Sequence, residues 1–279
     1  MNIKSTSSHH GSNSGDYLSF RSDKLSVLIN TGRLELRALL DSPDRLFEGA
    51  LILKDSRSVK AARVETAEAG VFFLKRYNSK GFFYALRHIL SKPRPAKVLR
   101  VSNLLRSAGV KTPQVLAAVF KYRYHLLLNT SYLITDYVEN IIPPNTLIPG
   151  LLGNKSYFTE YRNQVIFCLN HLHENCTTHG DLKIHNIYSR DTAAGLEVGL
   201  LDLDSVECYK SPLTAKTRAK DLARFVASII QVADSNHIAI DQLQISEFII
   251  TEYERVSGFS LDREYIGRRI KHHICRKRK

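Results

Sequence analysis

The sequence has few cysteines, and their spacing suits neither a metal site nor a disulfide framework. The 279 residues contain four, which are Cys168, Cys176, Cys208 and Cys275, and no two of them form a CxxC pair. A zinc knuckle needs such pairs, and a disulfide scaffold needs many cysteines in a short secreted chain. The cysteine pattern therefore argues against both classes and indicates a reducing compartment.

Long apolar runs are also missing. No stretch approaches the roughly 18 consecutive apolar residues that a membrane-spanning helix needs. Residues 1–16 are rich in Ser, Asn, Gly and His and lack the apolar core of a signal peptide, so we expect a disordered tail there. Hydrophobic residues still make up 43% of the chain, which is enough for a sizeable core. We expect a cytoplasmic protein.

Acidic residues are scarce relative to basic ones. The chain contains 40 Lys and Arg residues but only 27 Asp and Glu residues, so the formal net charge is +13. Such an excess predicts a polyanionic partner: nucleic acid, an anionic membrane surface or a phosphorylated substrate. The shortage is greatest between Glu68 and Asp136, where no acid occurs. The basic residues in the first part of that gap are Lys75, Arg76, Lys80, Arg87, Lys92, Arg94, Lys97, Arg100 and Arg106.

The first part of the chain favours strands, from residue 33 to residue 73. The segments "ALILKD" (50–55) and "SVKAARVE" (58–65) are apolar or alternating runs on either side of a polar turn. A second turn, "AEAG", leads into "VFFLKRY" (71–77). Consecutive strands with short turns predict an antiparallel meander.

A change of pattern follows. Residues 81–90 and 93–109 have helical spacing of apolar residues, and Gly109 stands where a helix C-cap would. Residues 110–120 and 124–138 return to a strand-like composition.

The prolines at positions 143 and 144 mark a break between two lobes. We therefore predict an N-lobe over residues 17–140 and a C-lobe over residues 141–279. In the C-lobe, residues 157–175 and 217–233 are predicted amphipathic helices, and residues 196–205 contain a strand.

The segment "THGDLKIHNIY" (178–188) concentrates hydrogen-bonding side chains on a predicted loop. It carries Asp181, Lys183 and Asn186, while Asp202 follows the next apolar run and Lys75 lies on a strand of the first lobe. These are the parts of a phosphoryl-transfer site. One carboxylate orients and deprotonates a hydroxyl, an amide oxygen and a second carboxylate hold Mg²⁺, and a lysine binds the phosphates.

The loop resembles that of the protein kinases. Residues 181–186 match the kinase catalytic loop D-L-K-x-x-N, Asp202 takes the place of the DFG aspartate, and Lys75 that of the V-A-I-K lysine. The resemblance implies an α+β, bilobal protein-kinase-like fold with an antiparallel-sheet N-lobe and a mainly helical C-lobe. It also implies that Asp181 and Lys183 are catalytic and that Asn186 and Asp202 bind the metal.

Further nucleotide contacts are predicted in the N-lobe. The sequence has no G-x-G-x-x-G, so "KDSRSVK" (54–60), with Ser56 and Arg57, is the candidate loop over the phosphates. Asp136 and Val138, at the end of the last predicted strand, complete the predicted contacts. Taken singly, each site residue has an alternative role, as a solvated strand lysine or as a turn former. In combination they favour the kinase interpretation.

Two other loop residues and one residue of the predicted helix over 217–233 carry structural predictions. In kinase folds an Asp at the position of Asp221 accepts hydrogen bonds from amides of the catalytic loop; the alternative is an acid that complements a helix N-terminus. We predict that His179 ties the loop to the Asp202 segment. Gly180 replaces the Arg of protein kinases, which indicates that no phosphorylated activation loop is clamped there.

One family is similar over a larger part of the chain. "FLKRYNSKGFFYALRHIL", "RSAGVKTPQVLAAV", "YLITDYVEN", "HGDLKIHN", "LLDLDS" and "AKDLARF" resemble the lipopolysaccharide core kinases, the Kdo/heptose kinase group, from about Leu51 to about Ile230. The resemblance implies ATP and Mg²⁺ as cofactors. It further implies a lipid-linked core oligosaccharide as acceptor, on the cytoplasmic face of the inner membrane.

One departure from the kinase pattern keeps alternatives open. Kinase folds pair the strand lysine with a Glu on the next helix, and the predicted helix after Lys75 contains no acid. An atypical Ser/Thr protein kinase and a nucleotide-binding pseudokinase scaffold therefore remain as alternatives. The basic stretches from Lys75 to Arg106 and from Arg268 to Lys279 predict contact with an anionic membrane surface. No RNA-binding motif or recognition helix supports nucleic acid as the partner.

Overall fold

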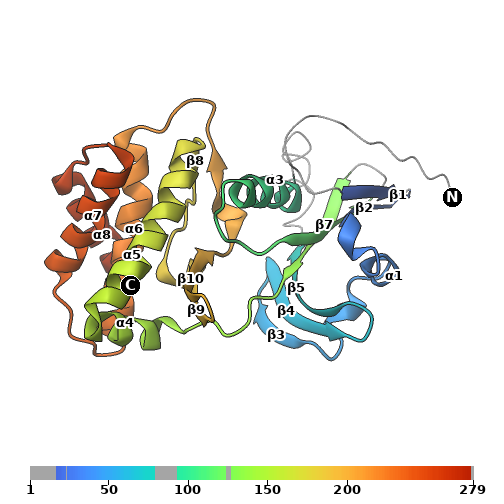
Figure 1. Cartoon of the computed structure of the whole chain (residues 1–279). Coiled ribbons are helices and arrows are strands. Elements are labelled where there is room, and N and C mark those ends of the chain that lie inside the picture. The colour runs from blue at the N-terminus through green and yellow to red at the C-terminus, as the bar shows by residue number, and fades with distance from the viewer. Residues whose placement is uncertain (1–16, 23, 79–92, 124–126, 278–279) are drawn as a thin grey trace. The chain divides into compact units, whose positions relative to one another are not determined.

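The structure is a computed structural model that describes residues 17–22, 24–78, 93–123 and 127–277. The chain forms two compact units (Figure 1). The first comprises residues 1–107 and 113–138, and the second comprises residues 108–112 and 139–279. The predicted tail over residues 1–16 and the predicted helix over residues 81–90 lie outside the described residues.

The first unit contains an antiparallel sheet, whose described strands number seven in the order β1-β2-β6-β7-β5-β4-β3. The predicted meander is confirmed as β3, β4 and β5. The strands are β1 (Tyr17–Arg21), β2 (Leu25–Asn30), β3 (Leu51–Asp55), β4 (Val59–Thr66), β5 (Gly70–Asn78), β6 (Val115–Arg123) and β7 (Leu127–Asp136).

The segment between β2 and β3 corrects the prediction of strands from residue 33 onward. It forms short helical turns: η1 (Thr31–Arg33), α1 (Leu36–Leu39) and η2 (Arg45–Phe47). Leu36, Leu40 and Phe47 are buried in the core on one face of the sheet. Asp44 fixes the segment there, because it accepts a hydrogen bond of 2.8 Å from the hydroxyl of Tyr132 in β7.

Helix α3 (Arg94–Ser107) packs against β6 and β7 and confirms the predicted helix over residues 93–109. Its buried side chains include Val98, Val101 and Leu105, at helical spacing. Gly109 follows with a φ of +78°, the left-handed conformation of a glycine C-cap. The prediction of a C-cap at Gly109 is therefore confirmed.

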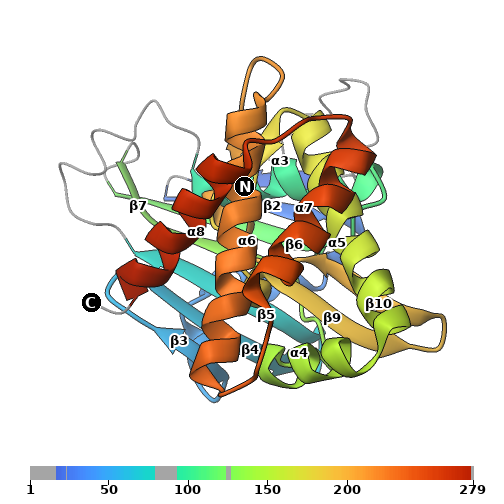
Figure 2. The ribbon, with the colours of Figure 1, turned by 90° about the vertical axis from the view of Figure 1, so that its left-hand side faces the viewer.

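The second unit is mainly helical, and its helices α5, α6, α7 and α8 pack together (Figure 2). No helix among the described residues is both long enough and apolar enough to span a membrane. The helices are α4 (Pro144–Gly153), α5 (Lys155–Glu174), α6 (Ala215–Ser235), α7 (Gln242–Ser257) and α8 (Arg263–Lys277). Two antiparallel pairs complete it: β8 (Thr177–Thr178) with β11 (Glu207–Cys208), and β9 (Ile187–Thr192) with β10 (Gly195–Leu200).

The basic stretch that begins at Arg268 belongs to helix α8, which packs on α6. Ile266 and Ile270, one turn apart, are buried and supply the apolar contact. The amide nitrogen of Gln231 in α6 donates a 2.8 Å hydrogen bond to the backbone oxygen of His273. The cations of α8 therefore divide between a face directed toward α6 and an exposed face.

Candidate active site

The buried carboxylate of Asp221 in α6 holds the loop between β8 and β9 in place. The backbone N–H groups of His179 and Gly180 donate to Asp221 at 2.7 and 3.0 Å, and His173 Nε2 lies 3.3 Å from the same carboxylate. Asp221 is 3% exposed. Burial would raise its pKa, but the hydrogen bond and charge of His173, the charge of His179 and the His179 N–H outweigh it, so the pKa is lowered. The predicted scaffold role of Asp221 is confirmed.

His179 joins the loop to the segment that carries Asp202. Its fully buried ring places Nε2 3.1 Å from the backbone oxygen of Leu201, to which that nitrogen can donate. The N–H of Leu201 in turn donates a 2.8 Å hydrogen bond to the backbone oxygen of Asn186. The predicted structural role of His179 is confirmed, and Asp202 immediately follows this double link.

Gly180 is required by the close approach of two backbone segments. Its φ is +76°, and a Cβ at this position would lie 2.4 Å from the backbone oxygen of Ser205. A contact under 3.0 Å to backbone forces a shift, and a positive φ is unfavourable for any side chain. The larger side chain that protein kinases carry here does not fit this loop.

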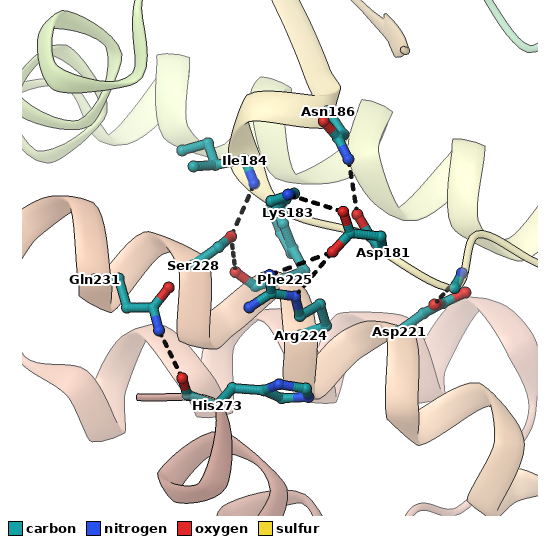
Figure 3. A network of polar contacts seen from close by, with 11 residues as sticks. Asp181, Lys183, Ile184, Asn186, Asp221, Arg224, Phe225, Ser228, Gln231 and His273 are labelled. Carbon is teal, nitrogen blue, oxygen red and sulfur yellow. Dashed lines mark hydrogen bonds and ion pairs between the residues drawn. The ribbon is translucent and has the colours of Figure 1, made fainter. Parts of the chain in front are cut away.

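Asp181 lies between two cations (Figure 3). The ammonium of Lys183 is 2.8 Å from Oδ2 of Asp181, while Nε and Nη2 of Arg224 lie 3.2 and 3.3 Å from Oδ1. The side chain of Asp181 is 33% exposed, so the carboxylate remains accessible to a substrate. Arg224 was not predicted from the sequence. Its position three residues after Asp221, one turn along the same helix, is the pattern that would have found it.

Asn186 and Asp202 are suited to hold a divalent cation through oxygen. The amide nitrogen of Asn186 donates a 2.9 Å hydrogen bond to the backbone oxygen of Asp181, which leaves the amide oxygen as the ligand atom. Asp202 is exposed and has a left-handed backbone, with a φ of 52°. Mg²⁺ binds through one or two protein oxygens and completes its shell with phosphate and water oxygens. The donor set therefore fits Mg²⁺ bound together with a nucleotide.

A pocket of about 630 Å³ opens beside Asp181 and lies entirely within the second unit. Its wall is formed by the loop, by one face of α6 and by the end of α8. The charged side chains of its wall include Asp181, Lys183, Lys220, Arg224 and Arg269. The contribution of α8 was not predicted, because the basic C-terminal stretch was assigned to a membrane surface alone.

Lys75 lies in the first unit, on β5, opposite Ala61 of β4 and Leu133 of β7. Strand alternation directs it away from the face on which Phe72 and Leu74 are buried. Its ammonium lies 5.5 Å from the centre of the Tyr77 ring.

The guanidinium of Arg94, at the start of α3, lies 5.9 Å from the same Tyr77 ring. Helix α3 contains no acid. The Tyr77 ring therefore has two cations within about 6 Å of its centre, the range of a cation–π contact.

The other predicted nucleotide contacts are also in the first unit. Ser56 closes the turn between β3 and β4, where its hydroxyl donates to the backbone oxygen of Val59 at 2.9 Å. The backbone oxygen of Arg57 accepts a hydrogen bond of 3.1 Å from the side chain of Asn78. Asp136 ends β7 and lies 3.9 Å from Arg33, and Val138 is half-buried at the end of the unit.

Comparison with known proteins identifies one family and one fold. The sequence model of the "Lipopolysaccharide kinase (Kdo/WaaP) family" matches residues 57–251. A solved structure, "WaaP in complex with acyl carrier protein", is similar with a TM-score of 0.52 and 13% identity, over 80% of this chain and 95% of that chain. At that identity the likeness shows the fold, which is kinase-like. No curated protein matches the sequence.

Proposed function

Because the chain belongs to the lipopolysaccharide kinase (Kdo/WaaP) family, and is therefore a kinase of lipopolysaccharide biosynthesis, we propose that it uses ATP to phosphorylate a heptose or Kdo hydroxyl of the inner core. The observation that carries the proposal is the accessible carboxylate of Asp181 at the wall of a pocket of about 630 Å³. The pocket offers space for a sugar ring beside a group that can accept a proton.

The proposed roles follow from phosphoryl-transfer chemistry. Asp181 orients the acceptor hydroxyl and takes its proton, and Lys183 balances negative charge on the transferred phosphoryl group. Asn186 and Asp202 would hold Mg²⁺, which would neutralise charge on the nucleotide phosphates when bound. Little covalent chemistry is left to the protein, so placement of these groups is its main contribution.

The first unit would supply the nucleotide contacts. Lys75 is proposed to bind the α- and β-phosphates, and the turn with Ser56 and Arg57 to cover them. Because the hydroxyl and the backbone N–H of Ser56 both donate to the backbone oxygen of Val59 within the turn, the exposed side chain of Arg57 is the better candidate for a phosphate contact. Asp136 and Val138 are proposed to contact the base.

A nucleotide-binding scaffold is the second candidate, because α3 carries no acid to pair with Lys75. One experiment separates the two. Incubate the protein with Mg·ATP and lipid-linked core oligosaccharide, and follow the acceptor by mass spectrometry. A gain of one phosphate supports the kinase; nucleotide binding without a product on any inner-core acceptor supports the scaffold.

Metal binding is tested separately by calorimetry of Mg·ATP with Asp202→Ala and Asp181→Asn. Asp202 is proposed as a metal ligand and Asp181 is not, so the first substitution should weaken Mg·ATP binding more than the second. Equal affinities of the two variants would contradict the metal role of Asp202.

We extend the proposal to the place where the protein acts. It binds the cytoplasmic face of the inner membrane through exposed basic side chains. Arg94, Arg100 and Arg106 are exposed along α3, and the helix itself contains no acid. Basic residues near an anionic leaflet contribute about 1 kcal/mol each.

Vesicle co-sedimentation across a salt series tests this membrane contact. Such binding weakens as salt rises, because exposed charges are screened beyond about 8 Å at physiological ionic strength. Replacing residues 276–279 by Ser removes four more cations and should weaken it further. Binding that is indifferent to lipid charge and to salt would require another partner, and nucleic acid is the first to test.

A further inference from the structure

The pocket beside Asp181 contains positive charge that the acids of the described part of the chain leave unbalanced. Lys183 and Arg224 are both paired with Asp181. No acid among the described residues lies within ion-pair distance of Lys220 or Arg269, although both line the pocket. The Nε atom of Arg269 is buried without a hydrogen-bond partner, and a donor in that state is costly unless a ligand repositions it.

The acids of the pocket wall do not offset these cations. The carboxylate of Asp221 is taken by two loop amides and by His173. Glu207, on β11, accepts a 2.9 Å hydrogen bond from the hydroxyl of Tyr209. The unbalanced cations therefore belong to the side of the pocket that α6 and α8 form.

Helices α6 and α8 place these cations side by side along the pocket. Lys220, Arg224 and Gln231 recur at helical spacing, so one face of α6 lines the pocket along its length. Gln231 is also the residue that binds the backbone of α8 at His273, which holds the end of α8 against this wall. Arg269 lies one turn before His273 on α8, and both line the same pocket.

We infer that Arg224, Lys220 and Arg269 form an anion subsite, and that it binds a carboxylate or phosphate which the acceptor sugar carries near the hydroxyl to be phosphorylated. The inference rests on the proposed function for the meaning of "acceptor". Guanidinium groups suit both anions, because their paired N–H donors match two oxygens of a carboxylate or a phosphate.

Arg224 would connect anion binding to the reaction. Its contacts to Asp181, at 3.2 and 3.3 Å, are longer than the roughly 2.7–2.9 Å of strong charge-assisted hydrogen bonds, so they can be exchanged. When the acceptor anion takes Arg224, Oδ1 of Asp181 becomes available to the acceptor hydroxyl. The hydroxyl oxygen then bonds to the γ-phosphorus, the bond to the β,γ-bridging oxygen breaks, the proton passes to Asp181 and ADP leaves.

Binding of soluble probes to the full chain tests the subsite directly. Three probes are titrated by calorimetry: a Kdo methyl glycoside, which carries a carboxylate, a heptose phosphate, and an uncharged heptose methyl glycoside. We expect at least one charged probe to bind about tenfold or more tightly than the neutral probe, since hydrogen bonds to charged groups are the strong ones. The charged probe that binds identifies the source of the anion.

Arg269→Gln should weaken binding of the charged probe about tenfold and leave the neutral probe unchanged. The matched control is Arg268→Gln, one residue away on α8. Arg268 pairs with Glu264 and does not line the pocket, so its loss should change neither affinity. Because Arg269 makes no ion pair with any residue that the structure describes, its variant should keep the unfolding midpoint of the wild type.

Arg224 is tested as a positioning residue by kinetics. Arg224→Gln should raise KM for a charged acceptor about tenfold and reduce the preference for charged over neutral acceptors, and Arg224→Lys should restore part of that preference. A purely structural role would lower activity toward both acceptors alike.

The outcomes separate the subsite from the proposed function. If the wild type transfers phosphate but its affinities for charged and neutral probes are equal, or do not respond to Arg269→Gln, the subsite is wrong and the kinase stands. If the wild type transfers no phosphate to any sugar, the proposed function fails, and the probe titrations still decide whether an anion binds.

Discussion

Two carboxylates a short distance apart in the second unit, those of Asp221 and Asp181, are held in different ways. Asp221 is 3% exposed and accepts hydrogen bonds from backbone N–H groups that cannot leave it. Asp181 is 33% exposed and is bound by the flexible side chains of Lys183 and Arg224. The first arrangement fixes a conformation, and the second can exchange partners.

These two arrangements distinguish a structural role for Asp221 from a chemical role for Asp181. A buried carboxylate satisfied by fixed donors contributes to stability, because removing it leaves those donors without a partner. An accessible carboxylate between mobile cations contributes little, since exposed ion pairs are worth about 0–1 kcal/mol. Its use must lie in what it binds. Substitution of either carboxylate should therefore affect stability or turnover much more than the other of these two quantities.

The largest effect is expected for Asp181→Asn on turnover. Loss of a general base lowers the rate by about 10²–10⁴. The free energy of unfolding should change by less than about 1 kcal/mol, because only exposed ion pairs are lost. Steady-state kinetics and urea unfolding measure the two quantities. Near wild-type turnover on a true acceptor would remove Asp181 from the mechanism.

Asp221→Asn should affect the free energy of unfolding more than turnover. The amide replaces one acceptor oxygen with a donor, which then faces the N–H groups of His179 and Gly180. We expect a loss of about 3 kcal/mol in the urea transition of the second unit, the cost of breaking a buried charged network. A variant as stable as the wild type would show that Asp221 does not hold the loop.

Gly180→Ala should have a smaller effect on stability, of about 2 kcal/mol, through backbone strain at a positive φ and the clash with Ser205. Activity should fall as well, because the displaced loop carries Asp181. Gly150→Ala in α4 is the control: a Cβ there meets no atom within 4 Å, so the substitution should not destabilise. Equal thermal midpoints of the two variants would contradict the close-approach argument.

The sequence predicts the loop well because the loop depends on local pattern. His179 and Asp221 have their predicted partners, and the strands of the meander and the helices α3, α5 and α6 follow from apolar periodicity. Strand β2, "LSVLIN", was not predicted, although most of its residues are apolar.

The role of α8 depends on tertiary packing and could not be predicted from the sequence. In α8 the buried apolar contacts of Ile266 and Ile270 are surrounded by charge, so the helix has the composition of a solvated tail. Whether a basic side chain such as Arg269 faces a pocket or water depends on the packing of α8 against α6. That packing cannot be derived from charge alone. The sequence therefore groups Arg269 with the membrane-facing charge of the basic C-terminal stretch.

The smallest expected effect is the response of stability to acid. The pKa of Asp221 in the folded protein is below its ordinary value of 3.8, because His173, His179 and the loop amide outweigh burial. A lowered folded pKa means that the unfolded state binds the proton first as the pH falls. The contribution of Asp221 is therefore complete above about pH 4 and is lost progressively below it.

Urea midpoints of the wild type and Asp221→Asn, measured from pH 6 down to pH 3, should isolate this contribution. The wild-type curve also contains Asp44 and Glu252, whose pKa values are lowered too, but these acids are unchanged in the variant and cancel in the difference. The gap between the two curves should stay constant at higher pH and narrow below about pH 4, as protonation removes the advantage of a charged Asp221. Parallel curves over the whole range would mean that Asp221 remains equally ionised in both states. Its backbone donors would then not favour the charged form. Asp221 and Asp181 would then differ only in how deeply they are buried.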